Sequence, residues 1–357
     1  MRRARWTLAA AALLVVAAWL SSYGESRPAE VVRKSIEFPA YQRRVDYDRM
    51  QTRRTLVLPV AAVSTPAAGQ NEDTSPKKRD PFLAALPARA EDPVVVLEAN
   101  ALRHSRLGEL FVQCAMSNDP DFFKKLQSEL GIDVLKDVDR VAFVGPAVVI
   151  SGYFDRLRAD QLQKETGAVG ERYGEAGTLY VPDAADGSTR MAAGTWRDQI
   201  LVLSDPATVR RALDQLEGRA PQAPVSLPDN IAYGELYGVI PGDSLRKLLR
   251  NEPDLLGDKL AAAANRIELH ADAMQDIAAV ATFRGTDSSA MSDLARAMGG
   301  VLAAARLQAQ ATGDRQGAEL LDQASVVPGD GNFTVQVALP IERIESWFAR
   351  CRPAGAP

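Results

Sequence analysis

NRIELHADAMQDIAAVATFRG, at residues 265–285, is the stretch of sequence that decides the fold. Apolar and β-branched residues recur through its two parts, NRIELHADA and DIAAVATFRG, and this pattern predicts two strands that pair with each other. Asp287 or Ser288 follows, and either side chain can cap the first turn of a helix. A strand pair that leads directly into a capped helix predicts an α+β fold, with an antiparallel sheet and helices on one face.

A long helix is predicted after this strand pair. Its apolar residues recur at i, i+3, i+7, i+10, i+11 and i+14, which is the spacing of one helix face. They are Met291, Leu294, Met298, Val301, Leu302 and Ala305. Gly299 and Gly300 lie within the helix at a cost of about 2 kcal/mol relative to alanine, so they need an explanation. Close packing against another element is favoured, and a kink or a groove for a partner is the alternative.

The same succession of elements is predicted twice along the chain. Residues 94–219, which begin with VVVLEA, and residues 229–351 each read strand, helix, helix, strand, strand, helix. GYFD at 152–155 corresponds to TFRGTD at 282–287, because each marks a strand that ends at a capped helix. The sequence therefore predicts a duplicated α+β unit with antiparallel sheets, behind an N-terminal transmembrane helix.

The predicted transmembrane helix is a hydrophobic run behind three arginines. No charged residue occurs from Trp6 to Gly24, and residues 6–20 read WTLAAAALLVVAAWL. A basic flank before about 20 uncharged residues predicts a single-pass inner-membrane protein with a cytoplasmic N-terminus. The alternative is a protein secreted after signal cleavage, but SYG at 22–24 is a poor cleavage site, so residues 1–24 are expected to remain as a signal-anchor. Both interpretations export the rest of the chain, in the first case to the periplasm.

Residues 25–93 are expected to form a disordered or extended spacer. The first part is basic, and residues 59–93 are rich in Pro, Ala, Ser and charge, which buries little apolar surface. Residues 1–54 hold 11 Lys or Arg and 5 Asp or Glu, and since the whole chain has a net charge of −4, the remainder carries −10. An acidic body argues against nucleic acid as a partner. The basic stretch either lies along anionic headgroups or is a solvated tether, and the tether is favoured.

The two cysteines, Cys114 and Cys351, are a candidate disulfide. In an oxidising compartment this bond would tie the C-terminus back to the first unit. Two buried free thiols are the alternative, because an unpaired cysteine behaves as a small hydrophobic residue. The sequence does not decide between them, since a disulfide requires the two Cα atoms to lie within about 7 Å.

A Ser-x-x-Lys pair occurs twice, without the further motif that catalysis would need. Ser75 and Lys78 lie in the spacer, where nothing holds a catalytic geometry. Ser244 and Lys247 start a predicted helix, in which the lysine would lie close enough to activate the hydroxyl. Enzymes that recognise penicillin combine this motif with a Lys-Thr-Gly strand, and only KETG at 164–167 comes near it. A serine in a first helical turn with a solvated lysine is therefore favoured.

Metal-binding patterns are equally weak. The chain has two histidines, His104 and His270, and only the spacing of His270 and Asp272 suggests a metal pair. Two groups of aspartates fit turn and cap roles better than a calcium loop. They are Asp133, Asp137 and Asp139, and Asp183 with Asp186. The sequence thus predicts no catalytic residue, no metal and no cofactor.

These observations favour a membrane-anchored, extracytoplasmic binding or scaffold protein without enzymatic activity. Its expected partners are the membrane, through the N-terminal helix, and an envelope protein or another copy of itself. Two alternatives stay open. One is a cell-envelope hydrolase whose site is built from scattered carboxylates or Ser244, and the other is a small-ligand carrier with a cavity between the two halves.

Overall fold

The computed structural model describes most of the chain from residue 80 onward. The described residues are Phe38, 80–87, 91–118, 121, 124, 127–128, 131–155, 157, 159–160, 163, 167–182, 191–220, 227, 231–249, 255–274 and 276–348. The predicted signal-anchor at 1–24 and most of the predicted spacer lie outside them. Among the helices of the described part, none is both long enough and apolar enough to cross a membrane.

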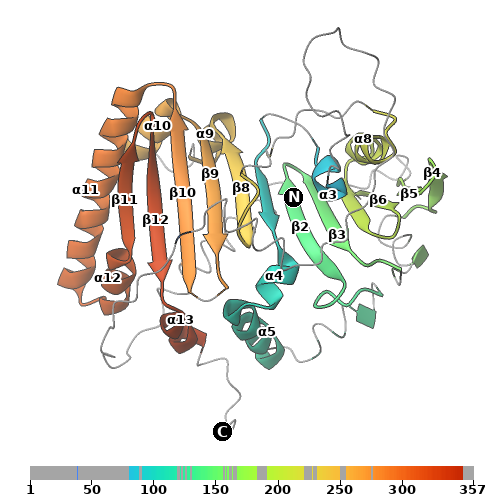
Figure 1. The fold of residues 1–357 in the computed structure, drawn as a ribbon, viewed down its shortest axis with the longest axis horizontal. Coiled ribbons are helices and arrows are strands. Elements are labelled where there is room, and N and C mark those ends of the chain that lie inside the picture. The colour runs from blue at the N-terminus through green and yellow to red at the C-terminus, as the bar shows by residue number, and fades with distance from the viewer. Residues whose placement is uncertain are drawn as a thin grey trace, which may run out of the picture.

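Within the described residues, twelve strands form one continuous sheet in which every neighbouring pair is antiparallel (Figure 1). The strands are β1 Val94–Leu97, β2 Val138–Val144, β3 Ala147–Gly152, β4 Glu171–Tyr173, β5 Gly177–Tyr180, β6 Ala192–Trp196, β7 Ile200–Ser204, β8 Leu236–Pro241, β9 Ala264–Asp272, β10 Ile277–Gly285, β11 Ala324–Gly329 and β12 Asn332–Leu339. Across the sheet their order is β11-β12-β10-β9-β8-β1-β2-β3-β7-β6-β5-β4.

Helices connect and flank these strands. Within the described residues they are α3 Pro81–Ala84, α4 Ala99–Arg103, α5 Arg106–Asn118, α8 Pro206–Leu216, α9 Gly242–Leu249, α10 Leu255–Ala263, α11 Ser288–Thr312, α12 Arg315–Asp322 and α13 Ile341–Phe348. The predicted α+β class, with a large antiparallel sheet and several helices, is confirmed.

The strands of each half of the chain stay together in the sheet. Strands β1 to β7 occupy one side and β8 to β12 the other, and β1 pairs with β8 between them (Figure 1). In this pairing Val94 lies opposite Val239, and Val96 lies opposite Tyr237. All four side chains are buried. Backbone hydrogen bonds and packed side chains therefore close the junction between the halves, and one sheet runs through both.

Helices cover opposite faces of the sheet in the two halves. In the first half, α3 and α8 contribute Phe82 and Leu213 to a buried apolar cluster that also holds Trp196 of β6. In the second half, Met291 of α11 joins a separate cluster with Phe283 of β10. Figure 1 shows α3 in front of the first-half strands, whereas β8 to β12 have no described helix in front of them on that side.

The alternation of side chains along β9 confirms that these clusters lie on opposite faces. Tyr237 of β8 belongs to the first cluster and lies opposite His270 of β9. Ile267 of β9 belongs to the second cluster, and Leu269 packs against it. Because successive residues of a strand point to opposite faces, His270 lies on the face of the first cluster, and α11 covers the other face.

The long helix begins as its sequence predicts. Asp287 accepts hydrogen bonds from the backbone N–H groups of Ser289 and Ala290 and so caps α11. The helix ends at Gly313, whose φ of +76° is a conformation that glycine adopts without strain. The predicted helix at this position is therefore confirmed, with both ends fixed by local chemistry.

The folded body begins earlier than the sequence predicted. Residues 80–87 were assigned to the spacer, but Phe82 and Leu86 are buried in the first apolar cluster. Asp80 caps α3 by accepting a hydrogen bond from the N–H of Phe82 at 3.0 Å, and it also forms an ion pair with Arg140 of β2. The assignment failed because the average composition of the whole segment conceals its short apolar run, PFLAAL.

We expect Phe82→Ala to lower the free energy of unfolding by about 3–4 kcal/mol, because the substitution leaves a cavity where the ring is fully buried. Chemical denaturation of the purified chain measures this change. Val169→Ala is the control, since Val169 is 68% exposed, and it should change the value by less than about 0.5 kcal/mol. Equal effects of the two substitutions would mean that α3 does not belong to the folded body.

Candidate functional site

Three acidic residues form a row across the strands where the two halves meet. Glu98 follows β1, Glu235 precedes β8 and Asp272 ends β9, and we call this row the acid belt. The N–H of Glu98 donates to the carbonyl of Glu235 at 2.7 Å, and the N–H of Glu235 donates to the carbonyl of Ala271 at 2.8 Å. Glu98 and Glu235 are each only 4% exposed. Carboxyl groups buried this deeply require hydrogen-bond partners.

Partners for both buried glutamates come from the chain itself. The hydroxyl of Tyr237 donates to Oε1 of Glu98 at 2.8 Å, which links β8 to the residue after β1. The backbone N–H of Ala273 donates to Oε2 of Glu235 at 2.7 Å. These bonds compensate part of the cost of removing the carboxyl groups from water. The acid belt therefore helps to join the two halves.

Glu235 and Asp272 interact electrostatically within the belt. Burial raises the pKa of Glu235 to about 7, and the neighbouring charge of Asp272 acts in the same direction. The N–H of Ala273 opposes this shift because it stabilises the ionised form. A carboxyl group that holds its proton near neutral pH beside a second carboxyl group is an arrangement used in general acid–base catalysis. A substrate would reach Glu235 only if the surrounding residues moved apart.

His270 lies on the same face of β9 as the belt. Its ring is 4% exposed and stacks on Tyr233, with ring centroids 3.8 Å apart and planes inclined by 6°. Burial lowers the pKa of His270 to about 4, so the ring is neutral at neutral pH. Its Nδ1 atom has no hydrogen-bond partner among the described residues. The ring thus serves as a packed, uncharged part of this sheet face.

Next to His270, a polar surface extends over β9, β10, β12 and β11 on the face opposite α11. Oε1 of Glu268 forms ion pairs there with the guanidinium groups of Arg266, at 2.7 Å, and Arg284, at 2.8 Å. The hydroxyls of Thr282 and Thr334 lie 3.3 Å apart on neighbouring strands. We call this surface the open face. By strand register it carries the polar residues Arg266, Glu268, Thr282, Arg284, Ser325, Asn332, Thr334 and Gln336, together with Val280 and Val327.

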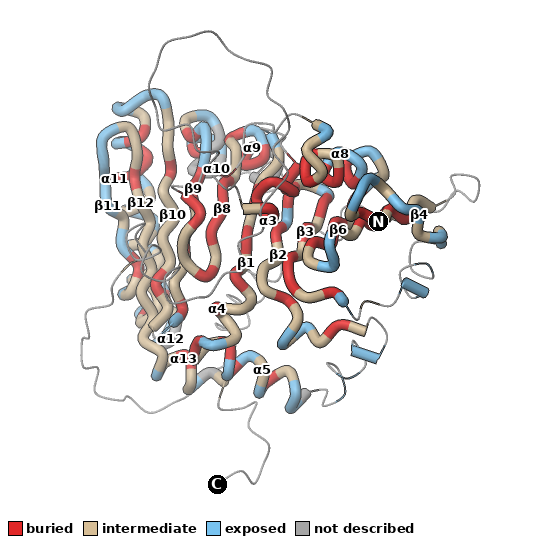
Figure 2. The backbone as a smooth tube through the Cα atoms, turned by 45° about the vertical axis from the view of Figure 1, so that its right-hand side comes forward, coloured by how far each residue is buried: buried red, intermediate tan, exposed pale blue. Residues whose placement is uncertain are grey.

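The open face is accessible as well as polar. The side chains of Arg266 and Arg284 are 44% and 43% exposed, although Glu268 between them is buried. Thr334 and Gln336 are partly exposed. Figure 2 shows intermediate burial along most of these strands, in contrast to the buried strands of the first half. Hydrogen-bonding groups beside two cationic side chains suit a polar partner surface.

The candidate nucleophile Ser244 takes part in the fold. It lies in the first turn of α9 and is 7% exposed. Its hydroxyl donates to the backbone carbonyl of Glu91 at 2.5 Å. This agrees with the favoured interpretation of a first-turn serine. The side chain of Lys247, both residues of the Ser75–Lys78 pair and residues 164–166 lie outside the described residues.

The two histidines belong to different elements. His104 is exposed after α4, where its Nδ1 donates to the carbonyl of Asn100 at 2.7 Å. His270 and Asp272 share a face of β9, as their spacing implies. Over the part of the chain that the structure describes, no group of three or more metal-ligating side chains comes together. A metal at the His270–Asp272 pair would therefore lack a third ligand from this part of the chain.

The first aspartate group shapes a turn before β2. Asp133 accepts a hydrogen bond from the N–H of Leu135 at 3.1 Å, and Asp137 accepts one from the N–H of Asp133 at 2.8 Å. The Nζ atom of Lys136 lies 3.2 Å from Oδ2 of Asp133. These are the turn roles that the sequence favours. Asp183 and Asp186 lie outside the described residues.

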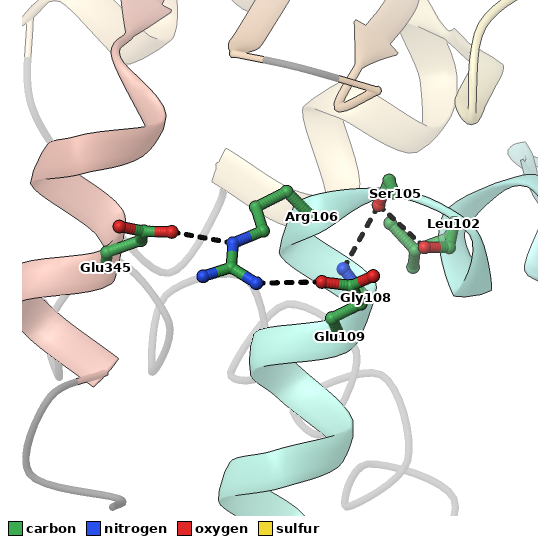
Figure 3. Close-up of polar contacts among 6 residues, drawn as sticks. All are labelled: Leu102, Ser105, Arg106, Gly108, Glu109 and Glu345. Atoms are coloured by element: carbon green, nitrogen blue, oxygen red, sulfur yellow. Dashed lines mark hydrogen bonds and ion pairs between the residues drawn. The ribbon is translucent and has the colours of Figure 1, made fainter. Parts of the chain in front are cut away.

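The last helix, α13, packs against α5 at the bottom of Figure 1. Arg106 of α5 joins the two helices, because it pairs with Glu345 of α13 at 2.6 Å and with Glu109 at 2.8 Å (Figure 3). Ser105 fixes the start of α5, since its hydroxyl accepts a hydrogen bond from the N–H of Gly108 at 3.0 Å. The end of α13 is thereby held near the helix that carries Cys114.

Cys114 lies on the buried side of α5, and its sulfur takes part in a disulfide. Cys351 is the other cysteine of the chain and lies outside the described residues, three positions after the end of α13 at Phe348. The Cys114–Cys351 bond stays a prediction. The packing of α13 on α5 is compatible with it, because a disulfide requires the two helical regions to be close.

None of the protein-family models and none of the curated proteins compared with this chain matches it. Among solved structures, "Structure of crystal form I of TP0453" is similar over 78% of this chain and 99% of that chain. The sequence identity is 11% and the TM-score is 0.41. A likeness at this level carries no argument about function.

Sequence reasoning did not find the acid belt or the open face. A signal for the belt was present, because Glu98 and Glu235 interrupt the apolar runs VVVLEA and NIAYGELYGVI. A charged residue in such a run either faces solvent or is buried with a partner. The strand pairing decides between the two, and the sequence alone does not show which strand lies next to β1.

We expect Glu235→Gln to stabilise the protein at high pH and to have little effect at low pH. The folded state binds the Glu235 proton more tightly than the unfolded chain, so the free energy of unfolding falls as the pH rises from about 4.5 to about 7. The full effect is on the order of 3 kcal/mol. The glutamine side chain does not ionise, so this loss of stability with rising pH disappears. Its amide oxygen can still accept the hydrogen bond from the N–H of Ala273. Urea denaturation at pH 4.5 and pH 8 measures the difference between the variant and the unmodified protein.

His270 changes stability in the opposite direction, which is why the comparison is made at each pH. Its lowered pKa makes the free energy of unfolding rise as the pH rises from about 4 to about 6.5. This contribution is present in both proteins and cancels in their difference. A difference between Glu235→Gln and the unmodified protein that does not vary with pH would contradict the buried, proton-holding state of Glu235.

We expect Cys114 and Cys351 to be joined by a disulfide in the purified chain. A thiol-reactive polymer added under denaturing, non-reducing conditions should label neither, and prior reduction should expose two sites. Cys351→Ser should leave one reactive thiol and lower the free energy of unfolding by about 2–4 kcal/mol, since the bond closes a long loop. The double Cys→Ser variant is the control for background labelling. Two labelled thiols without reduction would exclude the bond.

Proposed function

We propose that this chain is a non-enzymatic binding or scaffold protein of the bacterial cell envelope. Residues 1–24 hold it at the inner membrane as a signal-anchor, and the body lies in the periplasm. A polar partner, such as another envelope protein, binds the open face. The observation that carries this proposal is that the open face is polar and partly exposed, whereas the first half of the sheet has apolar clusters on both faces.

The N-terminal sequence supports the location. Three arginines precede an uncharged run that is close to the length needed to cross a bilayer, and a basic stretch follows it. The disulfide at Cys114 supports the same location, because disulfides persist in oxidising compartments. In this proposal, the segment between the anchor and Asp80 is a tether that lets the body reach partners away from the membrane surface.

We also propose that the folded body consists of two copies of one α+β unit. The sheet order outward from β1 is β2, β3, β7, β6, and outward from β8 it is β9, β10, β12, β11. In each direction the first strand is followed by two strands that are consecutive in the chain and then by a later strand pair. This shared order and the antiparallel β1–β8 pairing support two copies of one unit, related by an approximate two-fold axis through the junction. The second copy lacks equivalents of β4 and β5 in this sheet.

Hydrolysis is a second candidate function, and one observation favours it. Glu235 holds its proton near neutral pH beside Asp272, which is the pairing that an acid and a base require. The burial of Glu235 and its bond to Ala273 weigh against this use. A small-ligand carrier would need a cavity other than the β1–β8 junction, where buried side chains meet.

Site-specific photo-crosslinking in intact cells tests the open face. A photoreactive amino acid at Gln336 should form a covalent adduct with a discrete envelope protein. The matched control is the same amino acid at Glu171, which is exposed on β4 at the far edge of the sheet. An adduct at Gln336 that is absent at Glu171 supports the proposal. Equal patterns at the two positions, or none at either, would count against the open face as the binding surface.

The location has its own test. Protease added to spheroplasts should degrade the body, and the same treatment of intact cells should leave it whole. Disruption of the inner membrane should not be needed for cleavage. A body that is cut only after the inner membrane is broken would place it in the cytoplasm and contradict the proposal.

A further inference from the structure

The two sides of the second half carry different information about a partner. On the α11 side, a Cβ atom added to Gly299 or Gly300 would meet no described atom within 4 Å. The close packing against another element that the sequence favoured is thus wrong for the described residues, and nothing among them indicates what covers these glycines. The open face, in contrast, carries an excess of positive charge at Arg266 and Arg284.

Arg266 and Arg284 lie directly opposite each other on neighbouring strands of the open face. They are partners in the register of β9 and β10, and Asn332 of β12 follows in the same row. Like charges in directly opposed positions destabilise a sheet. The two arginines therefore need a compensating interaction in the chain, a use in binding, or both.

Glu268 compensates only one of the two positive charges. Its Oε1 atom forms ion pairs with Nη2 of Arg266 and with Nε of Arg284. Glu268 is 5% exposed, and one arginine would be enough to neutralise its buried carboxylate. Among the described residues, neither arginine pairs with a second acidic side chain. The three side chains thus have a net charge of +1, in a chain whose net charge is −4.

Most hydrogen-bond donors of the two guanidinium groups are left for another acceptor. A guanidinium group has five N–H donors, and each arginine turns a single nitrogen toward Glu268. Both side chains are more than two-fifths exposed, so a ligand can approach them from solvent. The buried carboxylate holds both groups through one oxygen, which limits their movement before a ligand arrives. Two oriented forks of this kind form a preorganised anion site.

The size of the excess charge favours a carboxylate over a phosphate group. A single carboxylate balances the net positive charge of the three side chains. A phosphate group carries about −1.5 to −2 at neutral pH, so it would leave excess negative charge beside the buried carboxylate of Glu268. One oxygen of Glu268 already lies within hydrogen-bond distance of both guanidinium groups, so their spacing suits a carboxylate oxygen.

Polar groups beside the arginines suit a carboxylate that belongs to a polypeptide. Thr282 lies opposite Glu268 in the register of β9 and β10, and its hydroxyl is 3.3 Å from that of Thr334. Asn332 lies opposite Arg284 and is partly exposed. A protein segment that crosses these strands would meet hydrogen-bonding groups on each side of its acidic residue.

We propose that Arg266 and Arg284 form a carboxylate-binding site, and that the partner of the open face places an acidic side chain in it. This inference rests on the proposed function, because it names the chemistry of the partner at the same surface. Both guanidinium groups donate to the partner's carboxylate, and Glu268 holds them in position from the buried side. The occupant is therefore an acidic protein segment.

A labelled peptide of ten glutamates tests the site on the purified full-length chain. A photoreactive amino acid at Gln336, on the same face, should capture this peptide, and the yield at increasing peptide concentration gives an apparent dissociation constant. This local readout does not record peptide bound to the basic stretch at residues 25–54. The same amino acid at Glu171 is the control position, because β4 lies at the far edge of the sheet. It should capture little peptide.

Arg266→Gln should raise the apparent dissociation constant about 10-fold or more, because it removes the excess charge and one of the two forks. The denaturation midpoint should change little, since Arg284 still pairs with Glu268. Arg296→Gln is the matched control, because Arg296 lies on α11, is 76% exposed and also pairs with one carboxylate, Asp293. It should leave the constant unchanged. Equal effects of the two substitutions, or no capture at Gln336 by the unmodified chain, would overturn the proposal.

Competition between small anions tests the chemistry of the ligand. At equal ionic strength, acetate should displace the glutamate peptide at least as well as inorganic phosphate does. Displacement by phosphate at concentrations at which acetate has no effect would indicate a site for phosphate, free or on a lipid. That result would overturn the proposal.

The photo-crosslinking experiment in cells separates this inference from the proposed function. An envelope protein captured at Gln336 and lost with Arg266→Gln, but not with Arg296→Gln, would support both. Capture that is unchanged by Arg266→Gln would keep the open face as the binding surface and would overturn the carboxylate site. Capture of the glutamate peptide by the purified chain without any adduct in cells would support the site and count against the proposed partner.

Discussion

The pairing of β1 with β8 is the contact on which the rest of the structure depends. Each of these strands has its second neighbour in its own half, β2 for β1 and β9 for β8. Without the central pairing the sheet would divide in two, and each part would expose the edge of a largely apolar strand. Val94 and Val96 are fully buried, so the junction is also part of the apolar core. The packing of α13 on α5, with the ion pair between Arg106 and Glu345, adds a second contact between the halves.

The buried acids at the end of this pairing fix the register of the strands, which apolar residues alone could not do. Three consecutive valines at 94–96 would pack almost equally well in neighbouring registers. The bond between Glu98 and Tyr237 forms in one register alone, because a shift by one residue moves the two side chains to opposite faces. Glu235 and its bond to Ala273 act in the same way on the other side of β8. The cost of burying the acid belt thus selects a single alignment of the halves.

The sequence predicts those parts of the fold that local chemistry determines. The strand pair at 265–285 and the Asp287 cap follow from patterns within a few residues, and both are present. α3 was missed because six apolar residues are hidden in a polar segment. The acid belt was missed because its residues are brought together by the pairing of strands more than 130 positions apart, Glu98 with Tyr237.

The two faces of the sheet differ in the second half of the chain. The open face is carried by residues such as Thr282 and Thr334, and α11 covers the other side of the same strands. A partner on the open face would therefore contact these strands without displacing α11 or the apolar cluster beneath it.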